Sequence, residues 1–306
     1  VISDRNTISG NTTNGILLNR IFITNPNPDP PTEAAASNNK IINSYIGTDV
    51  TGRYDLGNGG FGVNVVGGNA TVIGGATQEE RNVISGNNGG GVRIAKPNTT
   101  TTALAQNNRI IGNYIGLDAS TQFQLGNGVF GGGGMAPGVL IEDAPNNAVG
   151  GATDGEFNFI KYNLQNAGVV VTGAAATGNS ILRNYISNNV GLGIDLVNNG
   201  NNNQASPALT GVSLGTTTTT ISGFLTSVPS QNYRIEFFFN SQCDSSGSGE
   251  GENYLGGATN TPVGFINVTT NLVGVAGFNP TFNNFVAPAG TFLTATATRL
   301  SGGGAP

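Results

Sequence analysis

Apolar and polar positions alternate in short runs along this chain, and each run ends at a glycine or an asparagine. The alternation lasts only three to five positions before the chain turns, as in the run from Gly91 to Ile94. This period of two is typical of half-buried strands, and no run sustains the i, i+3, i+4 spacing of a helix. Val, Ile and Thr, which favour strands, recur in these runs. The pattern therefore predicts short strands separated by tight turns.

One segment of the sequence occurs twice, at 39–58 and, 69 residues later, at 108–127. The first copy contains Tyr-Ile-Gly-Thr-Asp from Tyr45 to Asp49, and the second contains Tyr-Ile-Gly-Leu-Asp from Tyr114 to Asp118. Repetition at a fixed period predicts stacked units rather than a globule around one pocket. The finer unit, Asn-x-Ile followed by Gly-Asn and Gly-Val-x-Ile/Val, predicts a right-handed parallel β-helix. We expect about nine coils of roughly 22–25 residues over residues 1–205.

Asparagine has two uses in such a stack. It tolerates the left-handed conformation of a tight corner, and stacked asparagines can hydrogen-bond one another from coil to coil. Each such bond contributes about 1 kcal/mol net, whereas a buried amide without a partner costs about 1–3 kcal/mol. Three stretches, 26–36, 99–106 and 131–138, interrupt the pattern and are expected to form loops on the flank of the rod.

The pattern changes after Ser206-Pro207. Alternating strands are expected at Thr216–Phe224, Tyr233–Phe239, Val263–Thr270 and Thr291–Thr298. Four antiparallel strands in about 100 residues are typical of a compact β-sandwich. We therefore expect an all-β chain, with the β-helix over 1–205, a small antiparallel Ig-like β-sandwich over 206–306, and a polar junction at 198–204.

Composition narrows the class of protein. Charged residues make up 9% of the 306 positions, which argues against intrinsic disorder when β-branched residues are frequent. A net charge of -5 without a basic cluster argues against a nucleic-acid partner. No segment approaches the roughly 18 apolar residues of a membrane span, so membrane insertion is not expected. The single cysteine, Cys243, cannot form an intramolecular disulfide.

The repeat resembles a known family. Its Asn-x-Ile and Ile-Gly-Thr-Asp phrases, followed by Leu-Gly-Asn and Gly-Val, are similar to the repeats of secreted bacterial right-handed β-helix proteins of the pectate-lyase-like superfamily. The segment 188–196 looks like the closing coil of those proteins, and 233–252 resembles the sandwich module that often follows it. The resemblance covers nearly the whole chain but departs at Arg299–Pro306, where the usual polar ending is replaced. It implies a secreted, extracellular or cell-surface protein, mostly of a kind without an assigned reaction.

The superfamily also contains polysaccharide lyases and hydrolases, so catalytic groups were sought. A lyase needs carboxylates that hold Ca²⁺ and a cationic base, and a hydrolase needs converging carboxylates. Histidine, the commonest general acid–base, is absent. Asp49 and Asp118 are expected to lie three coils apart, about 14 Å, which exceeds the ~5–9.5 Å needed for glycoside hydrolysis. Turn capping is the simpler interpretation of both, and no catalytic residue is assigned.

The densest acidic stretch holds the one candidate metal site. Asp244, Glu250 and Glu252, with loop carbonyls, could bind Ca²⁺, which accepts six to eight flexible oxygen ligands. The spacing does not match an EF-hand, and a hairpin tip with solvated charges is the simpler alternative. No other cofactor is expected.

The sequence favours a non-enzymatic extracellular structural protein: a surface stalk, an adhesin, or the subunit of a filament assembled end to end. Val1 begins inside a coil, and strand edges at the end of a β-helix must be capped or paired. A head-to-tail contact of that end with 291–306 of the next copy would propagate as a filament. The alternative is a secreted protein that binds or cleaves polysaccharide, with surface glycans as partners. Tryptophan is absent, and Tyr45 and Tyr114 could stack on each other instead of on sugars.

Overall fold

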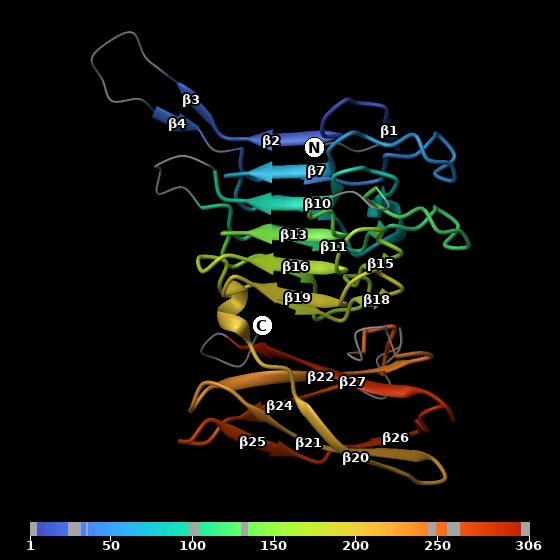
Figure 1. Cartoon of the computed structure of the whole chain (residues 1–306), viewed down its shortest axis with the longest axis vertical. Coiled ribbons are helices and arrows are strands. Elements are labelled where there is room, and N and C mark those ends of the chain that lie inside the picture. The colour runs from blue at the N-terminus through green and yellow to red at the C-terminus, as the bar shows by residue number, and fades with distance from the viewer. Residues whose placement is uncertain are drawn as a thin grey trace.

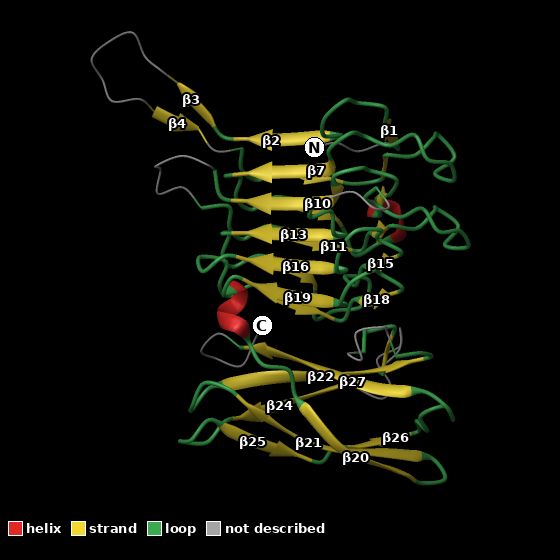
Figure 2. Cartoon of the chain, in the orientation of Figure 1, coloured by secondary structure: helices red, strands yellow, loops and turns green. Residues whose placement is uncertain are grey.

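The computed structural model describes residues 5–23, 32–34, 36–97, 104–129, 134–243, 249–255 and 264–300. Within these ranges the regular elements are β-strands except for two short 3₁₀ segments, η1 (Gln78–Glu80) and η2 (Gly200–Asn203). Figure 1 shows a stack of parallel strands followed by an antiparallel sandwich, and Figure 2 shows how little helix there is. The expected fold class, a parallel β-helix followed by a β-sandwich, is confirmed.

Three parallel sheets form the walls of the β-helix. Sheet 1 contains β1 (Asn6–Ile8), β6 (Ser44–Ile46), β9 (Val83–Ile84), β12 (Tyr114–Ile115), β15 (Phe159–Lys161) and β18 (Tyr185–Ser187). Sheet 2 contains β2 (Ile16–Asn19), β7 (Phe61–Val66), β10 (Gly90–Ala95), β13 (Val139–Glu142), β16 (Val169–Thr172) and β19 (Ile194–Val197). Sheet 3 contains β5 (Lys40–Ile41), β8 (Val72–Gly74), β11 (Arg109–Ile111), β14 (Ala148–Gly150) and β17 (Ser180–Leu182).

The core of the β-helix consists of aliphatic columns, because residues in register repeat the same side chain from coil to coil. In sheet 1 the column is entirely isoleucine: Ile8, Ile46, Ile84, Ile115, Ile160 and Ile186. Apart from Ile8 these side chains are at most 3% exposed. Corresponding columns of Val, Ile and Leu line sheets 2 and 3. The short strands therefore bury one row per coil, as their alternation predicted.

The stack has six coils among the described residues, not nine, and they are longer than expected. Residues in register are 47 positions apart from Ile16 to Val63 and from Val92 to Val139, but only 29 apart from Val63 to Val92. Long coils alternate with short ones as far as Val139, and the last two register steps, 30 residues from Val139 to Val169 and 25 from Val169 to Ile194, are both short. The 69-residue sequence repeat spans two coils. The estimate of nine was wrong because extra loops within the long coils contain the same Gly and Asn turns as the coils themselves.

Two of these extra loops, 48–57 and 117–126, project from the flank of the rod (Figure 1). Each closes on an isolated bridge, Thr48 with Asp55 and Leu117 with Gln124. The second loop lies on the first, since the backbone N–H of Ala119 donates to the carbonyl of Gly52 at 2.8 Å. The three insertions expected from the sequence include residues of 24–31, 98–103 and 130–133, which lie outside the described residues.

The sandwich has two antiparallel sheets. The proximal sheet, next to the β-helix, contains β22 (Asn232–Asn240), β23 (Asn253–Tyr254), β24 (Phe265–Thr269) and β27 (Phe292–Arg299). The distal sheet contains β20 (Ala208–Leu214), β21 (Thr218–Thr226), β25 (Val275–Phe278) and β26 (Thr281–Asn283). The four expected strands are present as β21, β22, β24 and β27. The other four were missed because they are short or lack a clear alternation.

A separate hairpin, β3 (Ile21–Ile23) with β4 (Thr32–Ala34), follows the first coil. It forms a two-stranded antiparallel sheet by itself. Figure 1 shows it projecting away from the stack, at the end opposite the sandwich.

Candidate functional site: the asparagine ladders and the joint with the sandwich

Three ladders of asparagine side chains connect the coils. Their members are Asn11, Asn58, Asn87, Asn127, Asn163 and Asn189 in the first; Asn82, Asn113, Asn158 and Asn184 in the second; and Asn108, Asn147, Asn179 and Asn201 in the third. In each ladder the Nδ2 of one asparagine donates to the Oδ1 of the next, over 2.7–3.4 Å. Most of these amides are fully buried, so their hydrogen bonds offset a desolvation cost that an unpaired amide would carry.

Apart from Asn201, which is a ladder member with a positive φ, the corner and ladder uses of asparagine fall on different residues. Where the coil turns tightly, the residue before a ladder asparagine has a positive φ: Gly10, Gly86, Asn107, Gly112, Asn146, Tyr162, Gly178, Arg183 and Asn188. That residue forms the corner, and the asparagine that follows it contributes its side-chain amide to the ladder. The Gly-Asn and Asn-Asn dipeptides whose first residue has a positive φ, such as Gly86-Asn87 and Asn146-Asn147, are therefore corner-then-ladder pairs. Tyr162 and Arg183 hold the same conformation, which is uncommon for bulky residues.

All three ladders point the same way, with Nδ2 toward the later coil. The last asparagine of a ladder therefore presents a donor that needs an acceptor. In the first ladder Asn189 Nδ2 donates to Glu250 Oε1 at 3.2 Å, and the same carboxylate accepts the backbone N–H groups of Asn188 and Asn189 at 2.5 and 3.3 Å. Glu250 thus supplies an acceptor from the sandwich side of the joint to the end of a β-helix ladder.

The other ladders also end on acceptors. Beside the last member of the second ladder, the backbone N–H of Arg183 donates to Glu236 Oε2 at 2.9 Å. The third ladder ends within η2, where Asn201 accepts from Asn179 and its Nδ2 donates back to the Asn179 carbonyl at 2.8 Å. Ile186 and Gly251 also exchange backbone hydrogen bonds of 2.8 and 3.0 Å across the joint. The sandwich and η2 therefore cap the last coil.

The three residues expected to hold Ca²⁺ have separate placements. Glu250 faces the last coil, whereas Glu252 accepts from the backbone N–H and hydroxyl of Ser241 at 2.6 and 2.8 Å. Asp244 lies outside the described residues. Across the described ranges, no group of three or more His, Cys, Asp or Glu side chains is arranged to hold a metal ion.

Strand β22 is buried on both faces, and one face carries charges. Tyr233, Ile235 and Phe237 point into the sandwich core, whereas Arg234 and Glu236, 5% and 1% exposed, face the β-helix. Arg234 Nε donates to Glu236 Oε1 at 2.9 Å. Its Nη2 lies 2.8 Å from the same oxygen, but the alignment does not make a second hydrogen bond. A buried pair of this kind needs both partners, because either charge alone would be desolvated without compensation.

Arg183 extends this charged cluster into the β-helix. Its guanidinium donates to the Ala152 carbonyl and to Asp154 Oδ1 at 2.8 and 2.6 Å, and lies over the Tyr254 ring. Burial raises the pKa of Glu236, while Arg234 and Arg183 oppose the rise. Burial likewise raises the pKa of Tyr254. These groups fit a structural joint, since Arg183, Arg234 and Glu236 are each held by a partner and buried, and Asp154 alone is exposed.

On the flank, Asp49 and Asp118 cap their own loops. Asp49 Oδ1 accepts from the backbone N–H groups of Arg53 and Tyr54 at 2.9 and 3.1 Å, and Asp118 holds Phe123 in the same way at 3.0 Å. Desolvation, the largest single influence, raises the pKa of Asp49, but the hydrogen bonds together outweigh it and bring that pKa to about 2. The turn-capping interpretation is confirmed.

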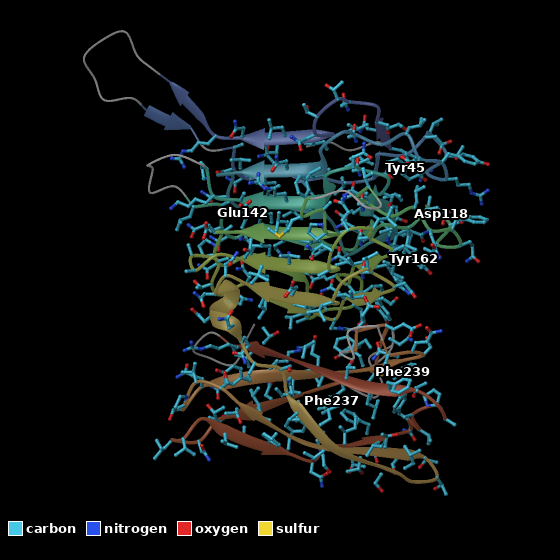
Figure 3. All side chains as sticks on the ribbon, in the orientation of Figure 1. Tyr45, Asp118, Glu142, Tyr162, Phe237 and Phe239 are labelled. Atoms are coloured by element: carbon cyan, nitrogen blue, oxygen red, sulfur yellow. The ribbon has the colours of Figure 1, made fainter. Side chains whose placement is uncertain are left out.

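The expected spacing of these two residues was wrong. One other coil lies between the coil of Asp49 and the coil of Asp118. The two residues are therefore two coils apart along the rod, about 10 Å at the spacing of neighbouring strands. Each carboxylate is nevertheless engaged by its own loop, and Figure 3 shows Asp118 on the outer flank. Tyr45 and Tyr114 do not stack on each other either, because Val83 lies between them in register. Tyr114 instead contacts Phe159, with ring centroids 5.4 Å apart.

Other charges of the β-helix pair between coils. Lys40 with Glu80, Arg93 with Glu142 and Arg109 with Glu156 make ion pairs of 2.5–2.6 Å. Glycine makes room for two of the carboxylates: a Cβ at Gly75 or Gly151 would lie about 2 Å from an oxygen of Glu80 or Glu156. Arg93 and Arg109 thus pair with carboxylates of another coil.

No helix in the described part of the chain is long and apolar enough to cross a membrane. Neither a scan against protein-family models nor a search of curated proteins finds a match to this chain.

Proposed function

We propose that this chain is a non-enzymatic structural protein of the cell exterior: a rod that serves as a surface stalk, an adhesin, or a filament subunit assembled end to end. One observation carries the proposal. The first and third amide ladders end on acceptors from the sandwich and η2, and beside the end of the second ladder the Arg183 N–H donates to Glu236 of the sandwich, which ties the β-helix and the sandwich into one stiff unit. Stiffness along one axis is what a stalk or filament needs.

The use of charge supports the same function. The described carboxylates of the flank and the joint hold turns, ion pairs or backbone N–H groups, as Asp49, Glu142 and Glu250 do. A hydrolase would instead keep two of them free and facing one sugar-binding subsite. The similarity of the repeats to secreted bacterial β-helix proteins supports placing the chain outside the cell.

The end of the rod opposite the sandwich offers a surface for assembly. Among the described residues β1, β2 and β5 each have a parallel neighbour on one side only. Such strand edges can accept another chain. Contact between this end and the sandwich end of another copy would be heterologous and would propagate.

Negative-stain electron microscopy of the native, unproteolysed protein tests this function. We expect regular filaments with an axial repeat near one rod plus one sandwich. Isolated short rods at high protein concentration, together with release of reducing ends or unsaturated products from polysaccharides, would overturn it.

One observation favours a second candidate, the binding of glycans. Tyr54 and Phe123, 69% and 62% exposed, lie on the two stacked flank loops. Exposed rings on a rigid flank are suited to stacking on sugars. Retention on insoluble polysaccharides, lost in the Tyr54→Ala, Phe123→Ala double variant, would support this role, and equal behaviour of the two proteins would reject it.

A further inference from the structure

The β3–β4 hairpin forms a two-stranded sheet that is not part of any larger sheet among the described residues. It pairs with no other strand among the described residues, and a lone two-stranded hairpin is at best marginally stable in water. All three residues of β3, Ile21, Phe22 and Ile23, are apolar. An apolar hairpin that projects from the rod is stabilised when it adds to another sheet.

The sandwich has an unfilled apolar groove on one side. Val212 and Leu214 of β20 pair with Ile221 and Thr219 of β21, both of which are completely buried. Opposite residues of paired strands share a face, so Val212 and Leu214 also face the space between the sheets. Both are nevertheless 53% exposed. The proximal sheet therefore does not cover this part of β20 in the distal sheet.

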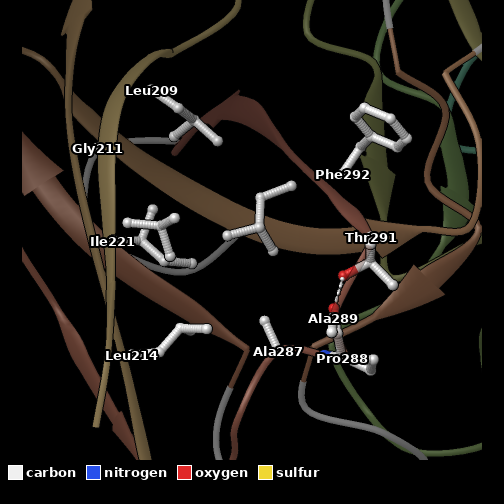
Figure 4. Close-up of a pocket in the computed structure, with 12 residues that line it drawn as sticks. Leu209, Gly211, Leu214, Ile221, Ala287, Pro288, Ala289, Thr291 and Phe292 are labelled. Atoms are coloured by element: carbon white, nitrogen blue, oxygen red, sulfur yellow. Dashed lines mark hydrogen bonds between the residues drawn. The ribbon is translucent and has the colours of Figure 1, made fainter.

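The groove has the form of a position for a missing strand. It is a hollow of about 380 Å³ between β20 and the segment 287–293, lined by Leu209, Ile221, Ala287, Pro288 and Leu293 (Figure 4). Within the described chain β20 pairs only with β21, and β27 only with β22. The two edge strands on this side thus leave backbone groups unpaired next to an apolar hollow, which is the arrangement that accepts an added strand.

We propose that the β3–β4 hairpin of one copy docks in this groove of a second copy, adding β3 to the free edge of β20 over Val212 and Leu214. This inference rests on the proposed end-to-end assembly and names its contact. The hairpin and the groove lie at opposite ends of the molecule (Figure 1). The contact is therefore heterologous, and each added copy presents a new hairpin and a new groove. Ile21 and Ile23 of β3 pair with Ala34 and Thr32 of β4, so these positions bring no charge to the apolar lining, whereas Phe22 pairs with the charged Glu33.

Two variants, one on each side of the contact, test the inference: Ile23→Asp in the hairpin and Leu214→Arg in the groove. Leu272→Arg, at a position 87% exposed, is the matched control. Association of the full chain is measured by sedimentation velocity in a reducing buffer, because Cys243 is exposed. Each contact variant is expected to associate at least about 30-fold more weakly than the original protein, as for loss of one buried interface anchor. The control is expected to associate normally.

Mixing the two contact variants sharpens the test. Each retains one competent surface, so an equimolar mixture should give a one-to-one complex and nothing larger. If either variant loses its circular dichroism spectrum, Ile21→Ser or Val212→Ser replaces it. Filaments from both variants equal to those of the original protein would reject the hairpin–groove contact and leave end-to-end assembly standing. Failure of the original protein itself to associate would reject the proposed assembly and this contact with it.

Discussion

The β-helix and the β-sandwich fill their interiors with different residues and connect them differently. Coils of the β-helix bury aliphatic columns and neutral amides, each of which contacts only the coil before and the coil after. The sandwich buries aromatic rings that meet across its two sheets, such as Phe237 and Phe282 at 5.3 Å. The first arrangement distributes stability over nearest neighbours, and the second concentrates it in one cluster. Charges are buried where the two meet, at Arg234, Glu236 and Arg183.

The largest effect is expected where the two regions meet. Glu236→Ala removes the acceptor of Arg234 and of the Arg183 backbone N–H, and breaking a buried ion pair in this way costs about 3–5 kcal/mol. Hydrogen exchange measured peptide by peptide should show a loss of protection in both β18 and β22. Glu236→Gln, which keeps the shape and one acceptor, should lose less. A loss confined to the sandwich would show that the joint does not couple the two regions.

A smaller effect is expected within the ladders. Asn87→Ala leaves the buried Asn58 and Asn127 amides without their common partner, at a cost of about 3 kcal/mol for two unsatisfied groups. The neighbouring Asn88→Ala is the matched control, since that side chain is exposed, and should change stability by less than about 0.5 kcal/mol. Urea unfolding followed by circular dichroism measures both. Equal losses in the two variants would show that the ladder adds little beyond the backbone pairing.

A substitution of Glu250 tests the cap of the last coil separately from the buried ion pair. Glu250→Ala removes the acceptor of three donors of the last coil, and hydrogen bonds to a charged group contribute about 1.5–3 kcal/mol. We expect a loss of about 2 kcal/mol in the β-helix transition, read by scanning calorimetry. Glu252→Ala, whose carboxylate bonds to Ser241 instead, should leave that transition in place. A Ca²⁺-dependent rise in the melting temperature of the original protein, absent from Glu250→Ala, would instead favour a metal role.

Lowering the pH should change the stability of the β-helix and of the sandwich differently. This is the smallest of the four expected effects. The pKa of Asp49 is lowered to about 2, and hydrogen bonds also lower the pKa values of Asp118, Glu80 and Glu156 against desolvation. A lowered pKa stabilises the fold above the unfolded value and loses that effect as pH falls through the folded value. Glu236 has a raised pKa, so its contribution is present at low pH and is lost as pH rises.

The β-helix transition should therefore move down between pH 7 and about pH 3, and the sandwich transition should move less. The change is small because these carboxylates lie on the flank of the rod, where nearby solvent screens their charge. Calorimetry at several pH values measures both transitions. A larger shift in the sandwich would contradict the assignment of these carboxylates to stabilising turns and ion pairs of the β-helix.

The sequence predicted the coils well because each coil repeats a local pattern. The Asn-x-Ile phrase and the period of two were enough to place most strands, and Asp49 was correctly interpreted as a turn cap. The number of coils was not predictable in the same way, since the loops at 48–57 and 117–126 contain the same turn residues as the corners. Spacing alone does not distinguish a longer coil from two short ones.

The joint could not be predicted from the sequence. Glu250 lies in a stretch that resembles a solvated tip or a metal loop, and its partners Asn188 and Asn189 precede it by about 60 residues. Nothing near either segment indicates the other. Glu236 carried one usable signal: a charged residue alternating with Tyr and Phe in a strand whose two faces are both buried. A polar residue at such a position implies a partner from another part of the fold.

The stacking of the coils also affects how readily the protein deamidates. An Asn-Gly bond decomposes when the glycine nitrogen attacks the asparagine side-chain carbonyl, releasing ammonia and leaving a succinimide. Besides Asn199-Gly200, where η2 begins, four such bonds lie in the stack, at Asn14-Gly15, Asn58-Gly59, Asn88-Gly89 and Asn127-Gly128. The glycine N–H of each donates to a carbonyl of a neighbouring coil, over 2.7–3.0 Å. The attacking atom is thus held away from its target, so a sequence prone to deamidation as a free peptide becomes long-lived once coiled.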